Sequence, residues 1–318
     1  MRVIFVGSTS LGLAVLDSVN SLEEVQIVGC ISAPPIFEIS YSQEPVSNVL
    51  HEDFRPYCDA AGIPIRLTAT GMRDPELRDW ASALAPDAFL VVGWHHMIPK
   101  AWRALAPAYG VHASLLPDLA GGAPLVWAMI LGRQGSGVTL FQMDDGVDTG
   151  DIVSQQAFPI HAHDTIAELL ERAETAAIEM IPRAMTLLAS GDLLSVPQTA
   201  SERVVMPQRS PADGLINWGG TVGEVERFVR AQTRPYPGAF THIAGKRVTV
   251  WRVSPLLHAG GQGYVRPASL GFASLTPIFW TDGSRLVACC ADGAVEISEA
   301  EVDGRVVAAR DLLAMRTD

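Results

Sequence analysis

Residues 2–31 read RVIFVGSTSLGLAVLDSVNSLEEVQIVGCI and carry the strongest signal for the fold class. Arg2 to Val6 is a β-branched and aromatic run that ends in Gly7, and Val25 to Ile31 is a second apolar, β-branched run. Between them, apolar residues from Leu11 to Val19 recur at helical spacing. Strand, helix and strand in this order open a doubly wound parallel sheet, so we expect an α/β fold.

The same alternation continues to about residue 189. Further strands are expected at Ala88–Val92, Val111–Ala113 and Gly137–Met143, and helices at Asp53–Ala61, Asp74–Leu84, Ala123–Leu131 and Ile166–Leu188. Residues 190–214 are rich in Pro, Ser, Thr and Gln and are interpreted as a linker between a first domain at 1–189 and a second at 215–318.

The second domain is expected to be smaller and β-rich. One helix, Val222–Gln232, precedes short strand-like runs at Ala239–Ile243, Arg247–Val253, Ile278–Trp280, Leu286–Cys290 and Ala294–Ile297. Short strands separated by glycine turns are typical of a small β-barrel.

The composition is globular, with an acidic balance. The chain has 318 residues, 48% of them hydrophobic and 18% charged, and a formal net charge of -12. Residues 1–204 hold 11 Lys and Arg against 24 Asp and Glu, whereas residues 205–318 hold 12 against 11. An acidic body with a nearly neutral tail repels phosphate backbones, so nucleic acid is disfavoured as a partner.

Other sequence features predict a cytoplasmic protein without a membrane segment or a metal site. The four cysteines, Cys30, Cys58, Cys289 and Cys290, lack zinc or thiol-redox spacing and are expected to pack as thiols. The apolar run at residues 1–7 is too short for a signal peptide. No uncharged apolar stretch reaches the roughly 18 residues that a membrane helix needs.

A glycine loop, Gly7-Ser8-Thr9-Ser10-Leu11-Gly12, follows the first strand and opens the first helix. The dinucleotide-binding fingerprint needs a glycine at the place of Thr9, and it needs an acidic residue after the second strand, where Ile31-Ser32-Ala33 stands. We therefore favour a tight strand-to-helix turn over a nicotinamide site.

The chemistry is concentrated in two blocks, Gly110-Val111-His112-Ala113-Ser114-Leu115-Leu116-Pro117 and Met143-Asp144-Asp145-Gly146-Val147-Asp148-Thr149-Gly150-Asp151. A histidine at the end of a strand and an acidic loop after the next strand lie where open α/β sheets bind ligands. Such a pair can move a proton during attack by an amine on an acyl carbon. A core histidine and a plain solvated turn are the alternatives. The acidic block does not match the pattern of a calcium-binding loop, because Thr149 occupies the position of the glycine that this loop requires.

Together these blocks resemble the signature of the formyltransferases that use 10-formyltetrahydrofolate. That family shows Asn-x-His-x-Ser-Leu-Leu-Pro, a glycine-rich stretch ending in Pro, matched by Gly121-Gly122-Ala123-Pro124, and an Asp-Thr-Gly loop. In the tail, Ile216-Asn217-Trp218 and Pro235-Tyr236-Pro237-Gly238 are similar to its C-terminal domain. The resemblance implies a Rossmann-like catalytic domain with a smaller OB-like domain.

The resemblance also implies roles for individual residues. His112 matches the catalytic histidine and Asp148 the catalytic aspartate, but Gly110 stands in place of the catalytic asparagine. The lost amide would need a water, a backbone N–H, or a substitute such as Ser114, His95 or Gln142. The residues implied in binding the folate are Met97, Ile98, Pro99, Ser114, Leu115, Leu116, Pro117, Asp144 and Gly146.

The resemblance leaves the acceptor open. We expect formyl transfer to an amine of a small molecule, either an amino sugar nucleotide or an amino acid derivative. The alternatives are methionyl-tRNA formylation, and folate binding with reduced or hydrolytic catalysis because of Gly110. Asp118 and Ala120 stand where many members of the family have basic residues. Residues 33–50 are either a variable surface loop or a wall specific to the substrate, and an oligomer is possible.

Overall fold

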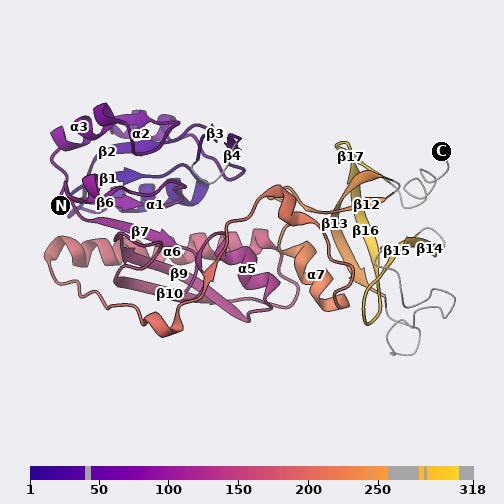
Figure 1. Ribbon diagram of the computed structural model, residues 1–318. Helices are drawn as coiled ribbons and strands as arrows, with labels where there is room; N and C mark the ends of the chain where they lie inside the picture. Colours follow the sequence, from indigo (N-terminus) through magenta and orange to yellow (C-terminus); the bar gives the residue numbers. More distant parts are fainter. Residues whose placement is uncertain (40–43, 244, 257–278, 283–284, 308–318) are drawn as a thin grey trace. The chain divides into compact units, whose positions relative to one another are not determined.

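The computed structural model describes residues 1–39, 44–243, 245–256, 279–282 and 285–307 (Figure 1). The chain divides into two compact units. The N-terminal unit comprises Met1–Pro124, Gly135–Pro159 and Leu170–Pro207, and the C-terminal unit comprises Leu125–Gln134, Ile160–Leu169 and Gln208–Asp318.

A mixed, mostly parallel sheet forms the centre of the N-terminal unit. Its seven described strands lie in the order β10 (Ile152–Pro159), β9 (Gly135–Gln142), β7 (Ala108–His112), β6 (Ala88–Val91), β1 (Arg2–Val6), β2 (Gln26–Ser32) and β5 (Ile65–Leu67). Strands β7, β6, β1, β2 and β5 are parallel, whereas β9 and β10 are antiparallel to their neighbours. The expected α/β fold is confirmed.

Helices cover this sheet and bury its apolar strands. They are α1 (Ser10–Asn20), α2 (Arg55–Ala61), α3 (Pro75–Ala83), α4 (Lys100–Arg103) and α6 (Ile166–Ser190), whose first residues belong to the C-terminal unit. On one face, Ile4 and Phe89 of the sheet pack with Leu77 of α3 and Trp102 of α4. A Cβ at Gly7 would lie 2.4 Å from the Val92 carbonyl oxygen, which explains the glycine at the end of β1 by close packing.

Several elements of the N-terminal unit differ from the sequence expectations, including β5 and α4, which were not expected. Strand β10 was not expected, because its exposed Gln155 and Gln156 break the apolar alternation that marks a strand. Strand β7 begins at Ala108 rather than Val111. Within residues 33–50, β3 (Ile36–Phe37) and β4 (Val46–Ser47) form an antiparallel pair, and residues 40–43 lie outside the described residues.

The segment expected to be a linker is bonded to the N-terminal unit over part of its length. Val196 forms a bridge with Ile152, and β11 (Val205–Met206) pairs in parallel with β8 (Ala120–Gly121). A short 3₁₀ turn, Ala200–Glu202, lies between them. We call residues 196–206 the strap. The domain limits at 189 and 215 stay predictions.

The C-terminal unit contains an antiparallel sheet. Its described strands lie in the order β12 (Ala239–Ile243), β13 (Lys246–Pro255), β16 (Ala294–Val302), β15 (Arg285–Cys289) and β14 (Phe279–Asp282), and β17 (Arg305–Val306) pairs with β16. Helices α5 (Pro124–Ile130) and α7 (Val222–Arg230) belong to this unit, with a 3₁₀ turn at Pro211–Gly214. Ile278, expected to begin a strand, lies outside the described residues.

Two sequence expectations concern cysteines and membrane helices. All four cysteines are buried and free, as expected for packing thiols. Among the described residues, no helix combines the length and the apolar character that crossing a bilayer requires.

Candidate functional site

His112 is the last residue of β7 and is buried, with 8% of its surface exposed. Its Nε2 lies 2.8 Å from the carbonyl oxygen of Leu119. A carbonyl can only accept, so Nε2 carries a proton and donates it. The other ring nitrogen, Nδ1, lies 3.6 Å from Oδ2 of Asp148. In a neutral ring, Nδ1 is therefore the atom free to take up a proton next to a carboxylate.

Asp148 lies in the loop between β9 and β10 with φ of +50°, a left-handed conformation that non-glycine residues seldom adopt. Its Oδ2 accepts a hydrogen bond of 2.8 Å from the Gly121 N–H. Its main-chain oxygen accepts from Gln198 Nε2 and from Arg203 Nη1, each at 3.0 Å. The Asp148 carboxylate that faces His112 is thus held by hydrogen bonds to its Oδ2 and to the main-chain oxygen of the same residue.

The segment after His112 is held by side chains of β9 and β10. Thr139 of β9 is fully buried, and its hydroxyl donates to Ser114 O at 2.6 Å and accepts from Leu116 N–H at 3.1 Å. Gln155 of β10 donates to Leu116 O at 2.8 Å and to the Thr139 hydroxyl at 2.9 Å. These bonds satisfy the buried backbone of Ser114–Leu116 and fix its course.

Gly110 lies on the same face of β7 as His112, two residues away. A Cβ at this position would lie 3.0 Å from Phe141 Cε1 and 3.2 Å from Met143 Cγ. Phe141 and Met143 therefore fill the space next to Gly110 that a longer side chain would need. The glycine belongs to a packed surrounding, so an asparagine could enter only if Met143 or Phe141 moved.

The suggested substitutes for the missing amide differ in their availability. The Ser114 hydroxyl is buried and donates to Asp118 O at 2.6 Å. His95 stacks on Phe37 with ring centroids 5.2 Å apart. Although part of His95 is exposed, desolvation of its ring, with a smaller contribution from His96, lowers its pKa to about 4. Ser114 is therefore committed to a loop bond, and His95 is neutral near pH 7.

The residues implied in folate binding lie in three segments of the sequence. Ser114, Leu115, Leu116 and Pro117 directly follow His112, whereas Met97, Ile98 and Pro99 lead into α4. Arg103 of α4 donates to Ile98 O at 3.2 Å and forms an ion pair with Asp145. That pairing lowers the pKa of the Asp145 carboxyl. Arg103 thus ties the Met97–Pro99 segment to the acidic loop that contains Asp144, Gly146 and Asp148.

Asp144 stabilises the turn of the acidic loop. Its Oδ1 accepts from Gly146 N–H at 3.0 Å and from the Thr149 hydroxyl. Both contacts lie within the loop itself, as in an Asx turn. Asp144 is exposed, as is Met97.

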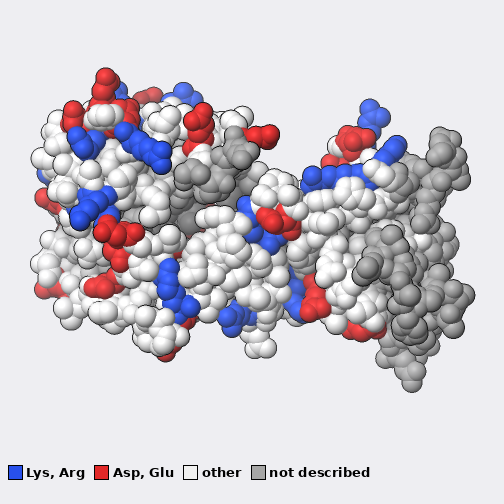
Figure 2. Space-filling model, in the orientation of Figure 1, with Lys and Arg blue, Asp and Glu red and all other residues white. Residues whose placement is uncertain are grey.

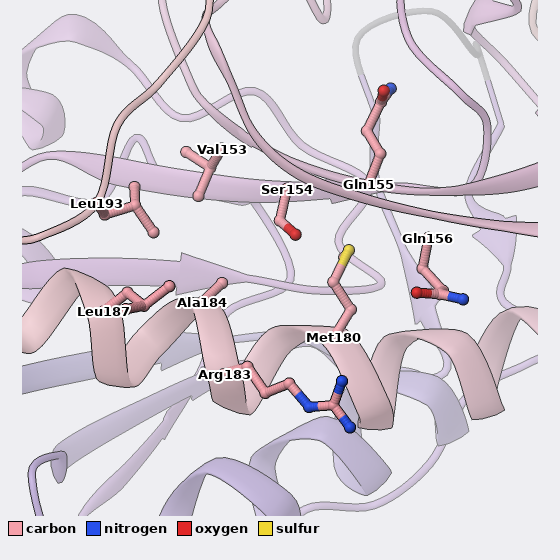
Figure 3. A pocket seen from close by; sticks show the side chains of 9 residues that line it. All are labelled: Val153, Ser154, Gln155, Gln156, Met180, Arg183, Ala184, Leu187 and Leu193. Atoms are coloured by element: carbon pink, nitrogen blue, oxygen red, sulfur yellow. The ribbon is translucent and has the colours of Figure 1, made fainter.

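A cavity of about 150 Å³ lies elsewhere in the N-terminal unit, between β10 and α6 (Figure 3). Met180, Ala184 and Leu187 of α6 face Ser154 of β10 across it. In Figure 3 the Gln155 side chain points away from α6, in agreement with its bonds to Leu116 and Thr139. The cavity contains neither His112 nor Asp148, so the facing His112 and Asp148 side chains, and not this cavity, define the candidate site.

The residues that hold the site were not found from the sequence; besides Thr139 and Gln155 they include Arg103, Gln198 and Arg203. Gln198 and Arg203 lie 50 and 55 positions after the residue that they hold. They come from the segment interpreted as a linker. A polar residue in a Pro- and Ser-rich stretch carries no local signal of such a bond, so only the fold could show it.

Comparisons with known proteins identify the family of the chain. Residues 1–185 match the formyl transferase family and residues 209–316 match its C-terminal domain. Methionyl-tRNA formyltransferase from Anaeromyxobacter sp. (strain K) is 31% identical over 310 residues, which is 96% of this chain and 93% of the relative.

Two solved structures share the fold. An N-formyltransferase from Helicobacter canadensis, in complex with folinic acid and dTDP-3-aminofucose, is 16% identical with a TM-score of 0.65, covering 93% of this chain and 98% of that one. HypX from Aquifex aeolicus in complex with tetrahydrofolic acid is 18% identical with a TM-score of 0.62, covering 98% of this chain and 47% of that one. The family matches span both halves of the sequence, and the chain belongs to the formyl transferase family, a family of enzymes.

Proposed function

We propose that the chain transfers a formyl group from 10-formyltetrahydrofolate to a primary amine, with His112 and Asp148 as the catalytic pair. The observation that carries the proposal is the 3.6 Å separation of His112 Nδ1 from the Asp148 carboxylate at the carboxyl end of β7. An amine that attacks the formyl carbon must lose a proton, and a base facing a carboxylate can accept it.

In this mechanism each protein group has one task. Nδ1 of His112 takes the proton from the attacking amine, and the imidazolium is stabilised by the Asp148 carboxylate and by the Leu119 carbonyl that accepts from Nε2. The collapse of the tetrahedral adduct then breaks the bond between the formyl carbon and N10 of the folate. The proton that this nitrogen needs returns from the histidine.

The folate would lie along Met97–Pro99, Ser114–Pro117, Asp144 and Gly146. Next to the first of these, Trp94 Nε1 and His96 Nε2 are buried and have no hydrogen-bond partner within the described residues. Buried polar groups in proteins are nearly always paired, so two open ring nitrogens fit a ligand that carries polar ring atoms, such as a pterin.

The acceptor with the stronger support is the α-amino group of methionyl-tRNA. The relative with that name is similar over 96% of this chain, including the tail. Figure 2 shows Lys and Arg side chains gathered over β12, β13 and β17 of the C-terminal unit. In the same unit, Arg247 lies over the Phe240 ring at 3.9 Å from its centroid. A local basic surface of this kind can bind phosphates although the chain as a whole is acidic.

A small amine is the second candidate. It is favoured by the acidic balance of residues 1–204 and by Asp118 and Ala120, which stand where many members of the family have basic residues. A neutral or cationic amine would meet less repulsion there than a polyanion would.

Gly110 allows a third outcome. Loss of one donor to a developing oxyanion typically slows an acyl transfer about 10²–10³-fold. With Phe141 and Met143 packed at Gly110, a water or a backbone N–H would have to supply that donor. If neither does, the chain would bind the folate with slow transfer, or release formate to water.

The experiment is a tetrahydrofolate-release assay with purified protein and 10-formyltetrahydrofolate. It compares methionyl-tRNA, deacylated tRNA, a panel of amino sugar nucleotides and amino acids, and no acceptor. Release with methionyl-tRNA alone supports the first acceptor, and release with a small amine supports the second. Equal release without any acceptor indicates hydrolysis. Folate binding with no release under any condition contradicts formyl transfer.

A further inference from the structure

The conformation of Asp148 needs outside support. Its φ of +50° lies in the left-handed region, where a side chain crowds the backbone. Such a residue persists only where its surroundings hold it, and residues of this kind cluster at functional sites. The support should therefore be visible as hydrogen bonds to the peptide groups around Asp148.

Two side chains of the strap provide those bonds. Gln198 Nε2 donates to Asp148 O at 3.0 Å and to Gly150 O at 2.7 Å. Arg203 Nη1 donates to Asp148 O at 3.0 Å, and its Nη2 donates to Val147 O. Three carbonyl groups of the loop thus accept from two side chains that are remote in sequence.

The strap is itself anchored on both sides of these residues. Before Gln198, the backbones of Val196 and Ile152 exchange two hydrogen bonds of 2.8 Å. After Arg203, Val204 O accepts from Ala120 N–H at 2.8 Å and Met206 O accepts from Gly122 N–H at 3.0 Å. The donors are therefore preorganised before any substrate arrives.

The same strand pairing reaches the carboxylate. Between those two bonds, Gly121 N–H points away from the strap and donates to Asp148 Oδ2 at 2.8 Å. The strap thus acts on Asp148 twice, directly on its backbone and through β8 on its side chain. Gln198 Oε1 is buried without a partner among the described residues, so the amide is placed for its two donor bonds at the cost of an unmet acceptor.

We propose that Gln198 and Arg203 are positioning residues for formyl transfer, which hold the Asp148 backbone in its left-handed conformation so that the carboxylate faces His112. The inference rests on the proposed function of the His112–Asp148 pair. Neither side chain needs to touch the folate or the amine. Their loss should therefore lower kcat and leave the KM for the folate nearly unchanged.

Gln198→Met and Arg203→Gln are the test variants. Methionine is close in volume to glutamine and has no donor, and glutamine replaces the charged guanidinium fork of Arg203, which bonds two carbonyl groups, with a shorter neutral amide. Arg2→Gln is the matched control. Arg2 donates to Leu84 O and Ala85 O, and Ala85 also has a positive φ, of +44°, but this turn precedes β6 at the opposite end of the strand from the site. The control therefore removes hydrogen bonds from an arginine to carbonyl groups at another residue with a positive φ, away from Asp148.

We expect each test variant to lower kcat about 10- to 100-fold, the loss that a small misplacement of a reacting group produces. Arg2→Gln should keep the wild-type kcat. Added methylguanidinium should restore part of the activity of Arg203→Ala, which a merely destabilised protein would not show. An unchanged kcat, or an equal loss in Arg2→Gln, would overturn the proposal.

A second measurement separates this inference from the proposed function. Amide hydrogen exchange of Gly121 reports its bond to Asp148 Oδ2 in the resting protein, with no substrate present. Faster exchange in Gln198→Met, but not in Arg2→Gln, supports the positioning of Asp148 by the strap even if the wild-type protein transfers no formyl group. Unchanged exchange contradicts this positioning even if the wild-type protein is active.

Discussion

The two segments that contain the candidate catalytic pair are held in opposite ways. The His112 segment lies over buried Thr139 and is bonded to its own sheet. The Asp148 loop is exposed at Asp144, Asp145 and Val147, and it is held by Arg103 on one side and by the strap on the other. One member of the pair is therefore fixed by the core, and the other by side chains from distant parts of the chain.

The largest effect should come from breaking the pair itself. His112→Gln should lower kcat about 10²–10⁴-fold, because it removes the group that takes the proton. Asp148→Asn keeps a residue that tolerates a positive φ and removes only the charge. If the two act as a unit, the double variant should be hardly slower than His112→Gln in steady-state kinetics. Multiplied losses would indicate independent roles.

A matched pair of threonine substitutions compares how the two segments are supported. Thr139→Val removes a buried hydroxyl and leaves Ser114 O and Leu116 N–H without partners, so it should lower the free energy of unfolding by about 1–3 kcal/mol. Thr149→Val removes one bond in the exposed loop and should cost about 0.5–1.5 kcal/mol. Urea unfolding of both variants measures the difference, and equal losses would contradict the contrast.

Gly110→Ala tests the packing next to His112. The added Cβ meets Phe141 and Met143 at 3.0–3.2 Å, so we expect a loss of about 1–2 kcal/mol in unfolding free energy, since half-buried Met143 can give way in part. In a double-mutant cycle, Met143→Ala should reduce the cost of the alanine. Strict additivity would show that Met143 does not restrict this position.

Arg103→Gln should have the smallest effect, because its partner Asp145 is exposed. We expect little change in stability and a modest rise in the KM for the folate, since the Met97–Pro99 segment loses its link to the acidic loop. Arg103 holds the pKa of Asp145 below its ordinary value, so the pair persists as the pH falls below that value. Any difference in stability between wild type and Arg103→Gln should vanish once the pH falls below the lowered pKa, because Asp145 is then protonated.

The same contrast explains what the sequence could predict. The apolar runs at Arg2–Val6 and Ala88–Val91 predicted their strands because both faces of a central strand are buried. Strand β10 lies at the edge of the sheet with half of its residues exposed, so its polar sequence resembled a loop. Residue type and position likewise pointed to His112 and to the acidic loop at Met143–Asp151, within which the family resemblance singled out Asp148.

The supports of the site were less predictable. Thr139 and Gln155 are ordinary residues of strands, and Gln198 and Arg203 lie in a stretch without periodicity. Gln198 and Arg203 become supports through the pairing of β11 with β8, a contact between segments about 85 residues apart that no local pattern encodes. The resemblance to a family supplied the candidate catalytic residues, whereas only the three-dimensional arrangement supplied the residues that hold them.

Because of the strap, the end of the family match and the end of the folded N-terminal unit fall at different residues. The family match to the first half ends at residue 185, yet residues 196–206 complete the surroundings of Asp148. A fragment cut at 189 would thus retain the signature motifs but lack Gln198, Arg203 and the strand that pairs with β8. A chimera that exchanges the C-terminal half should place its junction after Pro207, so that the strap stays with the N-terminal unit that it holds.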